Sequence, residues 1–596
     1  MKNIIIIEKL NLFSKFKIYL LNKNKYKFSI FHPYQIDENE ILFSLDKFDT
    51  IKINHSEEQE ITYKANQIAL DYLEKLNTDK IINFLNKLGY PKELVYAYKK
   101  YYFWKLTKKI RLSIFCKHIQ NNNKKYSVKL LGKNSFFLRN YSITKNTEIS
   151  PSKNNITFRR ILKSISIIIF YLPLWVIKDL LENGFSFKKI KTTEFKTGQH
   201  MCNNFYKRED YEHYEFGKSR NDIFLHKQLN FELNKSAFVM SSWKFNKEDM
   251  QKNIHTIIKN EGKLVEEFKL KSNFSLLNLY FWKYLKSLKL IKSLSVFNYE
   301  ELQVYSLIQM IRDIFIIEKF CMYYKIQRFY SRDDFNPLHI VRTVIFNKYK
   351  LKNYGVSHSI FLEPNTTLRG PYTFFNTYHT QGKIYYEMFK DTWKSNEHIN
   401  SGPIYGVLVD EAMKNHEKKL LFNKKYNQKI KYLLLVSNYD SNSNPFDSWK
   451  INSERIINLA KILNIDDDSV LFIVPRNKNT IKKYLIHIDK DRKFQKKIIM
   501  DNSFSTYELL AYCNVLITEA SSSSLFEATI NPNISIIPFN VRGINNLPFK
   551  RDKNIRVFHT SEEIYAFLSS IKKNNIDLST LKFNNNYIKS LLSNKS

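Results

Sequence analysis

Short runs of apolar residues alternate with amphipathic segments through the last third of the chain. Four runs bounded by polar turns predict buried strands: 431–437, 470–475, 514–519 and 534–539. Helical spacing fills the stretches between and beside them: 451–463, 505–513 and 525–530. Strands that alternate with helices are typical of a parallel, doubly wound sheet. Residues 429–575 are therefore predicted to form one α/β lobe.

A second unit of the same kind precedes it. Apolar spacing predicts a helix over 300–324, a strand over 326–330, a helix over 337–350 and a strand over 353–357. Asn336 and Pro337 suit the cap and first turn of the second helix. The strand ends carry Asp333, Asp334 and His358, and ligands in open α/β sheets lie beyond the carboxyl ends of strands.

The first 300 residues are less regular. Residues 3–7 and 27–32 predict two strands around a helical stretch, a β-α-β opening that suits the first strand of an N-terminal lobe. Residues 60–120 are helical in pattern, and the polar stretch 120–157 predicts a loop or a weak hairpin. The expected organisation is an N-terminal lobe over 1–395 with a helical insertion at about 60–300, a linker over 396–428, a C-terminal lobe over 429–575, and a tail over 576–596.

Glycine is scarce, and its distribution is uneven. Five of the twelve glycines lie between 355 and 406: Gly355, Gly370, Gly382, Gly402 and Gly406. That clustering predicts a loop-rich segment where the backbone turns sharply or approaches a ligand closely. Arg369 and His379 lie in this segment and are candidates to contact a phosphate group of a ligand.

Net charge and cysteine spacing limit the partners and sites that this protein is expected to have. The net charge of +38 suits nucleic acid, an anionic membrane surface or an anionic substrate. Abundant Lys, Asn, Ile, Tyr and Phe also indicate a bias toward A/T-rich codons, and the lysines are dispersed, so we expect no nucleic-acid partner. The four cysteines are far apart, which argues against a disulfide framework and a metal knuckle. No export signal is recognisable, so a cytoplasmic location is expected.

One apolar stretch, 164–177, raises the question of membrane contact. It is shorter than the ~20 apolar residues needed to span a bilayer, and it contains Pro173. One interpretation is an interfacial anchor, with Arg159, Arg160 and Lys163 at lipid phosphates and with Tyr171 and Trp175 at the headgroups. The other is a buried core helix.

The run Ser521, Ser522, Ser523 and Ser524 joins a buried strand to a helix. Hydroxyl groups and backbone N–H groups at such a turn favour phosphate binding. Glu527 has two interpretations. With Ser524 as N-cap it would form a capping box, and otherwise it could accept hydrogen bonds from ribose or sugar hydroxyls.

These residues resemble the C-terminal lobe of the GT-B glycosyltransferases of bacterial surface polysaccharides, the broad group with the capsule Kdo transferases and CDP-glycerol glycerophosphotransferases. The resemblance covers about 300–570. It rests on the serine turn with Glu527 and Ala528, on the preceding helix 506–513, and on a strand ending in Pro475 and Arg476. The segment 354–361 resembles the family strand that delivers a histidine, here His358, into the cleft between the lobes. Ser357 and Ser359 depart from that pattern, and Val474 replaces the family's histidine before the proline.

The resemblance implies an α/β fold of GT-B type, with two Rossmann-like lobes whose parallel sheets face a cleft. It implies a metal-independent glycosyltransferase that moves a sugar, or a polyol phosphate, from a nucleotide-activated donor to a membrane-proximal glycan or lipid-linked acceptor. The donor would bind Arg476, Ser521–Ser524 and Glu527, and the base would be Asp334, Asp333 or His358. No cofactor besides the nucleotide-sugar co-substrate is expected, and the enzyme would lie peripherally on the inner membrane. Three alternatives stay open: a nucleotide-sugar 2-epimerase, a basic nucleic-acid-binding protein and a non-catalytic scaffold.

Overall fold

The structure is a computed structural model, and it describes most of the chain. The described residues are 3–7, 26–30, 55–122, 127–131, 141–143, 149–151, 158–201, 232–240, 262–267, 270–292, 301–357, 371–436, 449–475, 497–500, 503–520, 522–540, 547 and 554–592. Among the predicted site residues, these fall outside the described ranges: His358, Arg369, Arg476 and Ser521.

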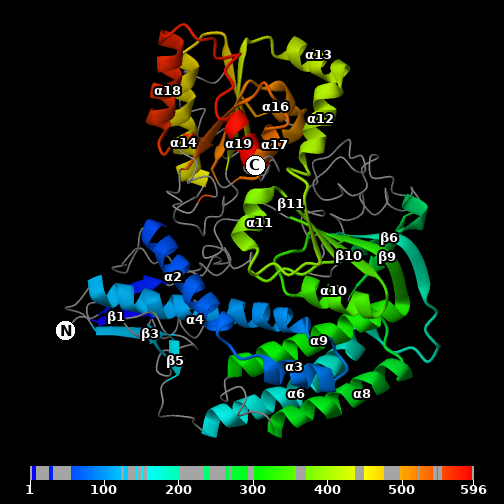
Figure 1. Cartoon of the computed structure of the whole chain (residues 1–596). Helices are drawn as coiled ribbons and strands as arrows, with labels where there is room; N and C mark the ends of the chain where they lie inside the picture. The colour runs from blue at the N-terminus through cyan, green and yellow to red at the C-terminus, as the bar shows by residue number, and fades with distance from the viewer. Residues whose placement is uncertain are drawn as a thin grey trace.

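A seven-stranded, wholly parallel sheet forms the middle of the molecule (Figure 1). Its order is β12-β11-β10-β9-β6-β7-β8. The strands are β6 (Thr193–Met201), β7 (Ser236–Met240), β8 (Lys263–Glu266), β9 (Tyr324–Ser331), β10 (Lys352–Val356), β11 (Thr377–Thr380) and β12 (Glu397–Asn400). Within this sheet, β6 comes first in sequence, and β7 and β8 are added on one side of it. The next strand in sequence, β9, pairs with the other side of β6. The sheet is therefore doubly wound, with its switch point between β6 and β9.

A five-stranded parallel sheet of order β15-β14-β13-β16-β17 forms the core of the C-terminal lobe. Its strands are β13 (Ile430–Val436), β14 (Ser469–Pro475), β15 (Ile498–Ile499), β16 (Val515–Glu519) and β17 (Ser535–Phe539). The helices of this lobe are α14 (Trp449–Ala460), η10 (Lys461–Asn464), α16 (Thr506–Tyr512), α17 (Ser524–Ala528), α18 (Ser561–Lys573) and α19 (Asn585–Leu592). The switch point lies between β13 and β16. The predicted fold class, α/β with two parallel sheets, is confirmed.

Helices surround the larger sheet and form a separate N-terminal layer. They are α2 (His55–Glu74), α3 (Asp79–Lys87), α4 (Leu94–Asn122), α6 (Phe158–Asn183), η7 (Leu233–Lys235), α8 (Phe274–Leu288), α9 (Glu301–Tyr323), α10 (Leu338–Lys348) and α11 (Lys383–Phe389). α9 packs against α10, and α4 packs against both of them. The long helix α4 thereby joins the N-terminal layer to the helices that cover the larger sheet.

The prediction for the first strand was wrong in its placement. β1 (Asn3–Ile7) is a strand, but it pairs in parallel with β2 (Tyr26–Ile30) and β3 (Ser127–Leu131) in a separate three-stranded sheet. The first strand of the larger sheet is β6 instead. The predicted weak hairpin is present as the antiparallel pair β4 (Tyr141–Ile143) and β5 (Ile149–Pro151).

The segment predicted to be loop-rich contains regular structure that the sequence did not reveal. Residues 371–404 contain β11, α11 and β12. β12 is an edge strand whose four side chains are exposed or half-buried, and β11 reads Thr-Tyr-His-Thr. Neither strand shows the apolar run that marks a buried strand, so pattern alone did not identify them. The end of the predicted linker contains two helices, α12 (Gly406–Lys414) and α13 (His416–Lys425), divided at Asn415.

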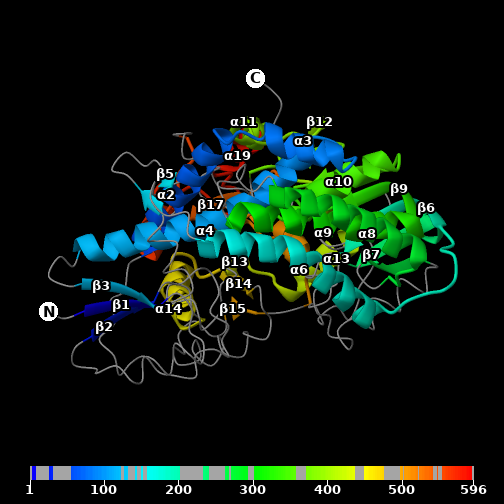
Figure 2. The same cartoon turned by 90° about the horizontal axis from the view of Figure 1, so that it is seen from below.

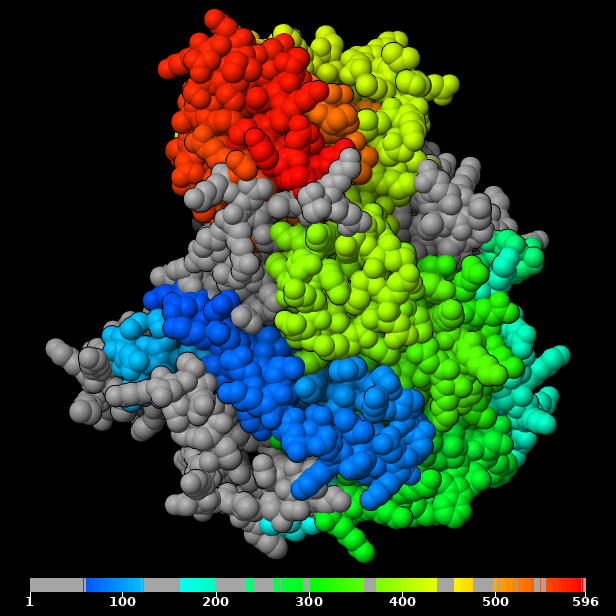
Figure 3. Space-filling view, viewed as in Figure 1, coloured from blue at the N-terminus to red at the C-terminus, as the bar shows by residue number. Residues whose placement is uncertain are grey.

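The two lobes share part of one hydrophobic core. Phe375, Tyr378 and Tyr385 of the larger lobe belong to the same buried cluster as Phe526 and Leu592 of the C-terminal lobe. The space-filling view shows the segment around α11 and α12 as the link between the lobes (Figure 3). This shared core fixes which edges of the two sheets face each other.

Candidate functional site at the edge between the sheets

Asp333 and Asp334 lie where the larger sheet changes direction. They follow β9 after one intervening residue, Arg332, and β9 pairs with β6 on one side and β10 on the other. Two strand ends diverge at such a switch point, and the crevice between them is where open α/β sheets bind ligands. The structure therefore places Asp333 and Asp334 at the carboxyl end of β9, the strand that the sequence predicted over 326–330.

Asp333 is a buried carboxylate with an unusual pKa. Both of its oxygens accept hydrogen bonds from Asn336 Nδ2, at 2.5 and 2.6 Å. Burial raises the pKa of Asp333 to about 6, while the charge of Arg342 and the bonds from Asn336 oppose that rise. A carboxylate with this pKa is ionised at neutral pH and accepts a proton readily, as a general base must.

Asp334 is held by two groups that are remote in sequence. Tyr378 Oη, on β11, donates to Asp334 Oδ2 at 2.8 Å. Lys100 Nζ, on α4, donates to the backbone oxygens of Asp334 and Tyr372 at 2.8 and 2.9 Å. Burial lowers the pKa of Lys100 to about 7, although the charges of Asp334 and Asp333 counteract it. We call Asp333, Asp334, Lys100 and Tyr378 the acidic centre.

His339 lies directly behind the acidic centre in the first turn of α10. Its ring stacks on Phe375, with centroids 4.8 Å apart, and its Nδ1 donates to the Asn336 carbonyl. Burial and the charge of Lys100 hold the pKa of His339 well below its usual range, so the ring is neutral. Its Nε2 is buried and has no hydrogen-bond partner among the described residues. Asn336 thus positions both His339 and Asp333.

The predicted cap of α10 was partly wrong. Pro337, rather than Asn336, occupies the N-cap position, and the first helical residue is Leu338. The Asn336 side chain still satisfies a free backbone group, because its Oδ1 accepts from the Leu338 N–H at 2.9 Å. Its Nδ2 is thereby left to bind Asp333.

The serine turn follows β16, which borders the switch point of the smaller sheet. Ser522 and Ser524 are half-buried, whereas Ser523 and Glu527 are buried. Ser523, not Ser524, is the N-cap of α17, and it makes no side-chain cap bond. The capping box considered for Ser524 and Glu527 is therefore absent, since it required Ser524 at the cap. α17 has only five residues, so the placement at the switch point, rather than a helix dipole, is what suits this turn to an anion.

Contacts between the lobes turn these two edges toward each other. The rings of Tyr385 on α11 and Phe526 on α17 meet edge to face, with centroids 5.9 Å apart. A Cβ built on Gly406 would lie 2.4 Å from Ile530 Cγ1, so α12 approaches the end of α17 closely. Tyr507, at the start of α16, packs against a cluster that includes Val356, the last residue of β10. The carboxyl edges of both sheets therefore border the same interlobe region (Figure 1).

His379 follows Tyr378 of the acidic centre on β11, two strands from β9. It is on β11, opposite Val356 of β10, and its Nδ1 is 2.8 Å from Ser401 Oγ. Burial lowers the pKa of His379. The Ser357 N–H donates to the His379 carbonyl at 2.9 Å, which joins the ends of β10 and β11.

Several residues of the centre escaped the sequence analysis. Lys100 and Tyr378 are 234 and 44 positions from Asp334, and no local pattern links them to it. Arg332 precedes the carboxylates, and its guanidinium lies 5.2 Å from the ring centre of Tyr405. Only Asn336 carried a usable signal, because the Asn-Pro step already indicated a helix start.

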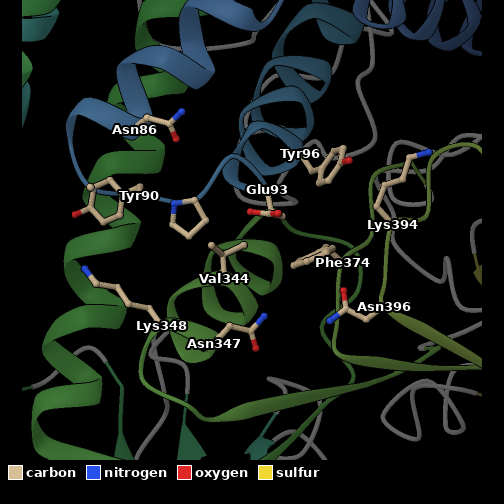
Figure 4. A pocket seen from close by; sticks show the side chains of 12 residues that line it. Asn86, Tyr90, Glu93, Tyr96, Val344, Asn347, Lys348, Phe374, Lys394 and Asn396 are labelled. Carbon is tan, nitrogen blue, oxygen red and sulfur yellow. The ribbon is translucent and has the colours of Figure 1, made fainter.

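A separate pocket of about 810 Å³ lies at the other edge of the larger sheet (Figure 4). It is lined by Tyr90 and Glu93 before α4, by Lys348 at the end of α10, and by Asn396 before β12. These positions mark the amino ends of the strands, whereas the acidic centre lies at the carboxyl ends. The pocket is therefore distinct from the candidate site.

Comparison with known protein families finds no family that the sequence matches, and comparison with curated proteins finds no match. Solved structures do match. A glycosyltransferase from Rickettsia africae is 14% identical, covering 67% of this chain and 93% of its own, with a TM-score of 0.34. The wall teichoic acid polymerase TagF is 14% identical, covering 73% and 96%, with a TM-score of 0.33.

The UDP-GlcNAc 2-epimerase from Neisseria meningitidis, bound to UDP-GlcNAc, is 9% identical, covering 68% of this chain and 95% of its own, with a TM-score of 0.38. The expected similarity to GT-B glycosyltransferases and to the epimerases on the same scaffold is confirmed.

Proposed function

We propose that this chain is a glycosyltransferase that moves a sugar, or a polyol phosphate, from a nucleotide-activated donor to an acceptor hydroxyl. One observation carries the proposal. A buried acidic centre at the switch point of the larger sheet borders the same interlobe region as a serine turn at the switch point of the smaller one. Transfer needs a base on the acceptor side and an anion site on the donor side, and the two edges offer one each.

On the donor side, Ser522 and Ser524 are half-buried, and their hydroxyl groups suit phosphate oxygens. Glu527 stays a candidate for the ribose or sugar hydroxyls of the donor. The predicted contributions of Ser521 and Arg476 belong to the same proposal, since a guanidinium pairs with phosphate oxygens in a bidentate manner. The neighbours named TagF and UDP-GlcNAc 2-epimerase were solved with CDPG and UDP-GlcNAc, and a ligand of that class fits this proposal.

On the acceptor side, we assign the base to the acidic centre, with Asp333 first and Asp334 and His358 as its alternatives. Asp333 takes the proton of the acceptor hydroxyl as that oxygen attacks the anomeric carbon of the sugar. The bond to the nucleotide diphosphate breaks, and the diphosphate leaves with the electron pair against the serine turn. Lys100 and Tyr378 hold Asp334 in place through their hydrogen bonds.

A nucleotide panel tests the donor assignment. We expect one of UDP, CDP, GDP or CMP, or one of their sugars, to raise the melting temperature selectively. At a concentration 100 times Kd, binding adds about 2.7 kcal/mol to the free energy of unfolding. A Ser522→Leu variant should lose the shift for the selected nucleotide and keep the same melting temperature without it.

Indifference to every nucleotide in the panel would contradict the proposal. A chain that binds UDP-GlcNAc and isomerises it without any acceptor would instead be an epimerase. Product analysis with and without acceptor separates the two activities.

A further inference from the structure

Helices α6 and α8 lie side by side and antiparallel on the outer face of α9. Ser272, before α8, donates its N–H to the carbonyl of Gly184, after α6. Further along, Tyr284 Oη of α8 donates to the Ile169 carbonyl of α6 at 3.0 Å. The residue numbers rise along one helix as they fall along the other, and both views show the pair beside α9 (Figures 1 and 2).

The same contact explains how α6 contains a proline without breaking. Pro173 has no N–H to donate to the carbonyl of Ile169, four residues earlier. Tyr284 Oη supplies the missing donor from α8. α6 is therefore a single long helix because its neighbour satisfies the group that Pro173 leaves free.

The inner face of this pair is anchored in the folded lobe. Trp175 of α6 packs against Tyr280 of α8 and Phe315 of α9, with ring centres 6.1 and 6.5 Å away. A buried ion pair joins Asp179 of α6 to Lys319 of α9 at 2.6 Å. α6 is thus held along its length against α9, which leads directly into β9.

The outer face of the pair carries large apolar side chains in contact with solvent. On α6 they recur at helical spacing and form one stripe: Phe170, Leu174, Ile177 and Leu181. On α8 they are Phe274, Phe281, Trp282 and Leu285. Both helices turn their buried faces to α9, so the two stripes form one surface, which we call the α6–α8 face. Exposed apolar patches of this kind mark interaction sites.

The border of the α6–α8 face is basic. The exposed lysines at its helix ends and edges include Lys178, Lys188, Lys189, Lys271, Lys286 and Lys289. Among the described residues of α6 and α8, the only acidic side chain that is exposed is Glu182, which pairs with Lys178. An apolar strip with aromatic residues and a lysine border complements a bilayer interface, where acyl chains lie beneath anionic headgroups.

Residues Ile161–Asn183 of α6 are long and apolar enough to cross a membrane, and 17% of the most apolar window is buried. Crossing would require α6 to leave α9, with loss of the Asp179–Lys319 pair and of the Trp175 contacts. A helix fixed along a folded domain can instead lie in the plane of the interface. The contacts therefore favour a helix that lies on the membrane.

We propose that the α6–α8 face docks this protein on an anionic lipid bilayer, with both helices parallel to the membrane plane. The inference goes beyond the transfer reaction and does not depend on it. It also revises the anchor expected from the sequence. Tyr171 and Trp175 face inward, and the residues in contact with lipid are instead Phe170, Leu174 and Leu181 with the aromatic residues of α8.

Vesicle co-sedimentation of the full chain tests the proposal. We expect binding to vesicles of phosphatidylcholine mixed with phosphatidylglycerol, and much weaker binding to phosphatidylcholine alone or at high salt. The double variant Leu174→Glu with Leu181→Glu should bind the anionic vesicles at least about tenfold more weakly, since two apolar side chains no longer enter the interface.

The matched control is Leu420→Glu with Leu421→Glu on α13. These leucines are 69% and 62% exposed, close to the 61% and 81% of Leu174 and Leu181, but they lie on a helix without an apolar stripe. The control should bind vesicles like the unmodified chain. Circular dichroism should show equal helix content in all three proteins, because every substituted side chain is exposed.

Three results would overturn the proposal. The unmodified chain does not sediment with anionic vesicles, or both double variants lose binding equally, or Leu174→Glu with Leu181→Glu changes only self-association in sedimentation equilibrium. The last result would assign the α6–α8 face to a second copy of the chain. Nucleotide binding in the thermal panel is measured without lipid, so failure of one proposal is distinguishable from failure of the other.

Discussion

Replacing Asp333 by Asn should reduce the turnover number for transfer by about 10²–10⁴-fold, the usual contribution of a general base. The variant keeps an oxygen that can accept from Asn336, and it no longer buries a charge. Its free energy of unfolding at pH 7 should therefore stay within about 1 kcal/mol of the unmodified chain. The measurement is steady-state transfer with the donor selected in the nucleotide panel, alongside urea unfolding.

Asp391→Asn is the control for this experiment. Asp391 is an exposed aspartate of the same lobe, so its loss should leave the turnover number unchanged. Full activity in Asp333→Asn would show that Asp333 is not the general base. The base would then be Asp334 or His358. A variant that fails to bind the nucleotide would indicate a structural role instead.

The rate of transfer should depend on pH through the titration of Asp333. The pKa of Asp333 is about 6 in the folded chain, so kcat/KM should fall as the pH drops below about 6 and Asp333 becomes protonated. The contribution of Asp333 to the free energy of unfolding changes with pH in the opposite direction. Because the folded pKa lies above the ordinary aspartate value of 3.8, this group stabilises the fold most at low pH, and that contribution is lost as the pH rises through 6.

Replacing Arg342 by Met should lower the free energy of unfolding by about 3–5 kcal/mol, the effect of leaving one partner of a buried ion pair uncompensated. Arg342 and Glu267 are fully buried. The guanidinium donates to both carboxylate oxygens, with distances of 2.7–3.1 Å. Without Arg342, the Glu267 carboxylate stays buried with no cation. The measurement is urea unfolding followed by circular dichroism.

The double variant Arg342→Met with Glu267→Met should recover most of that loss, because both charges are removed together. Lys390→Met provides the exposed counterpart, because its pair with Glu387 lies in solvent and its loss should leave the free energy of unfolding nearly unchanged. Equal stability of Arg342→Met and the unmodified chain would contradict this account.

In the double variant the pKa of Asp333 should rise further, because the charge of Arg342 lowers that pKa in the unmodified chain. The fall of kcat/KM on the acid side should therefore move to higher pH.

The sequence determined the C-terminal lobe and the strand ends. The strands β13, β14, β16 and β17 are buried on both faces, and such strands are continuous apolar runs that need no partner to be recognised. For the same reason, the position of Asp333 and Asp334 after β9, and that of the serine turn after β16, followed from the pattern alone. Placement at a carboxyl edge is a local property of each strand.

Only the tertiary structure decided what surrounds those residues. Lys100 reaches Asp334 from a helix 234 positions away, and burial among remote side chains, rather than neighbours in sequence, sets the pKa of Asp333 and Lys100. Packing likewise decided that β1 starts a separate sheet and that Trp175 faces inward while Leu174 faces solvent. The sequence alone showed that α6 is apolar. Which of its two apolar faces meets protein depends on where α8 and α9 lie, and a one-dimensional pattern does not contain that information.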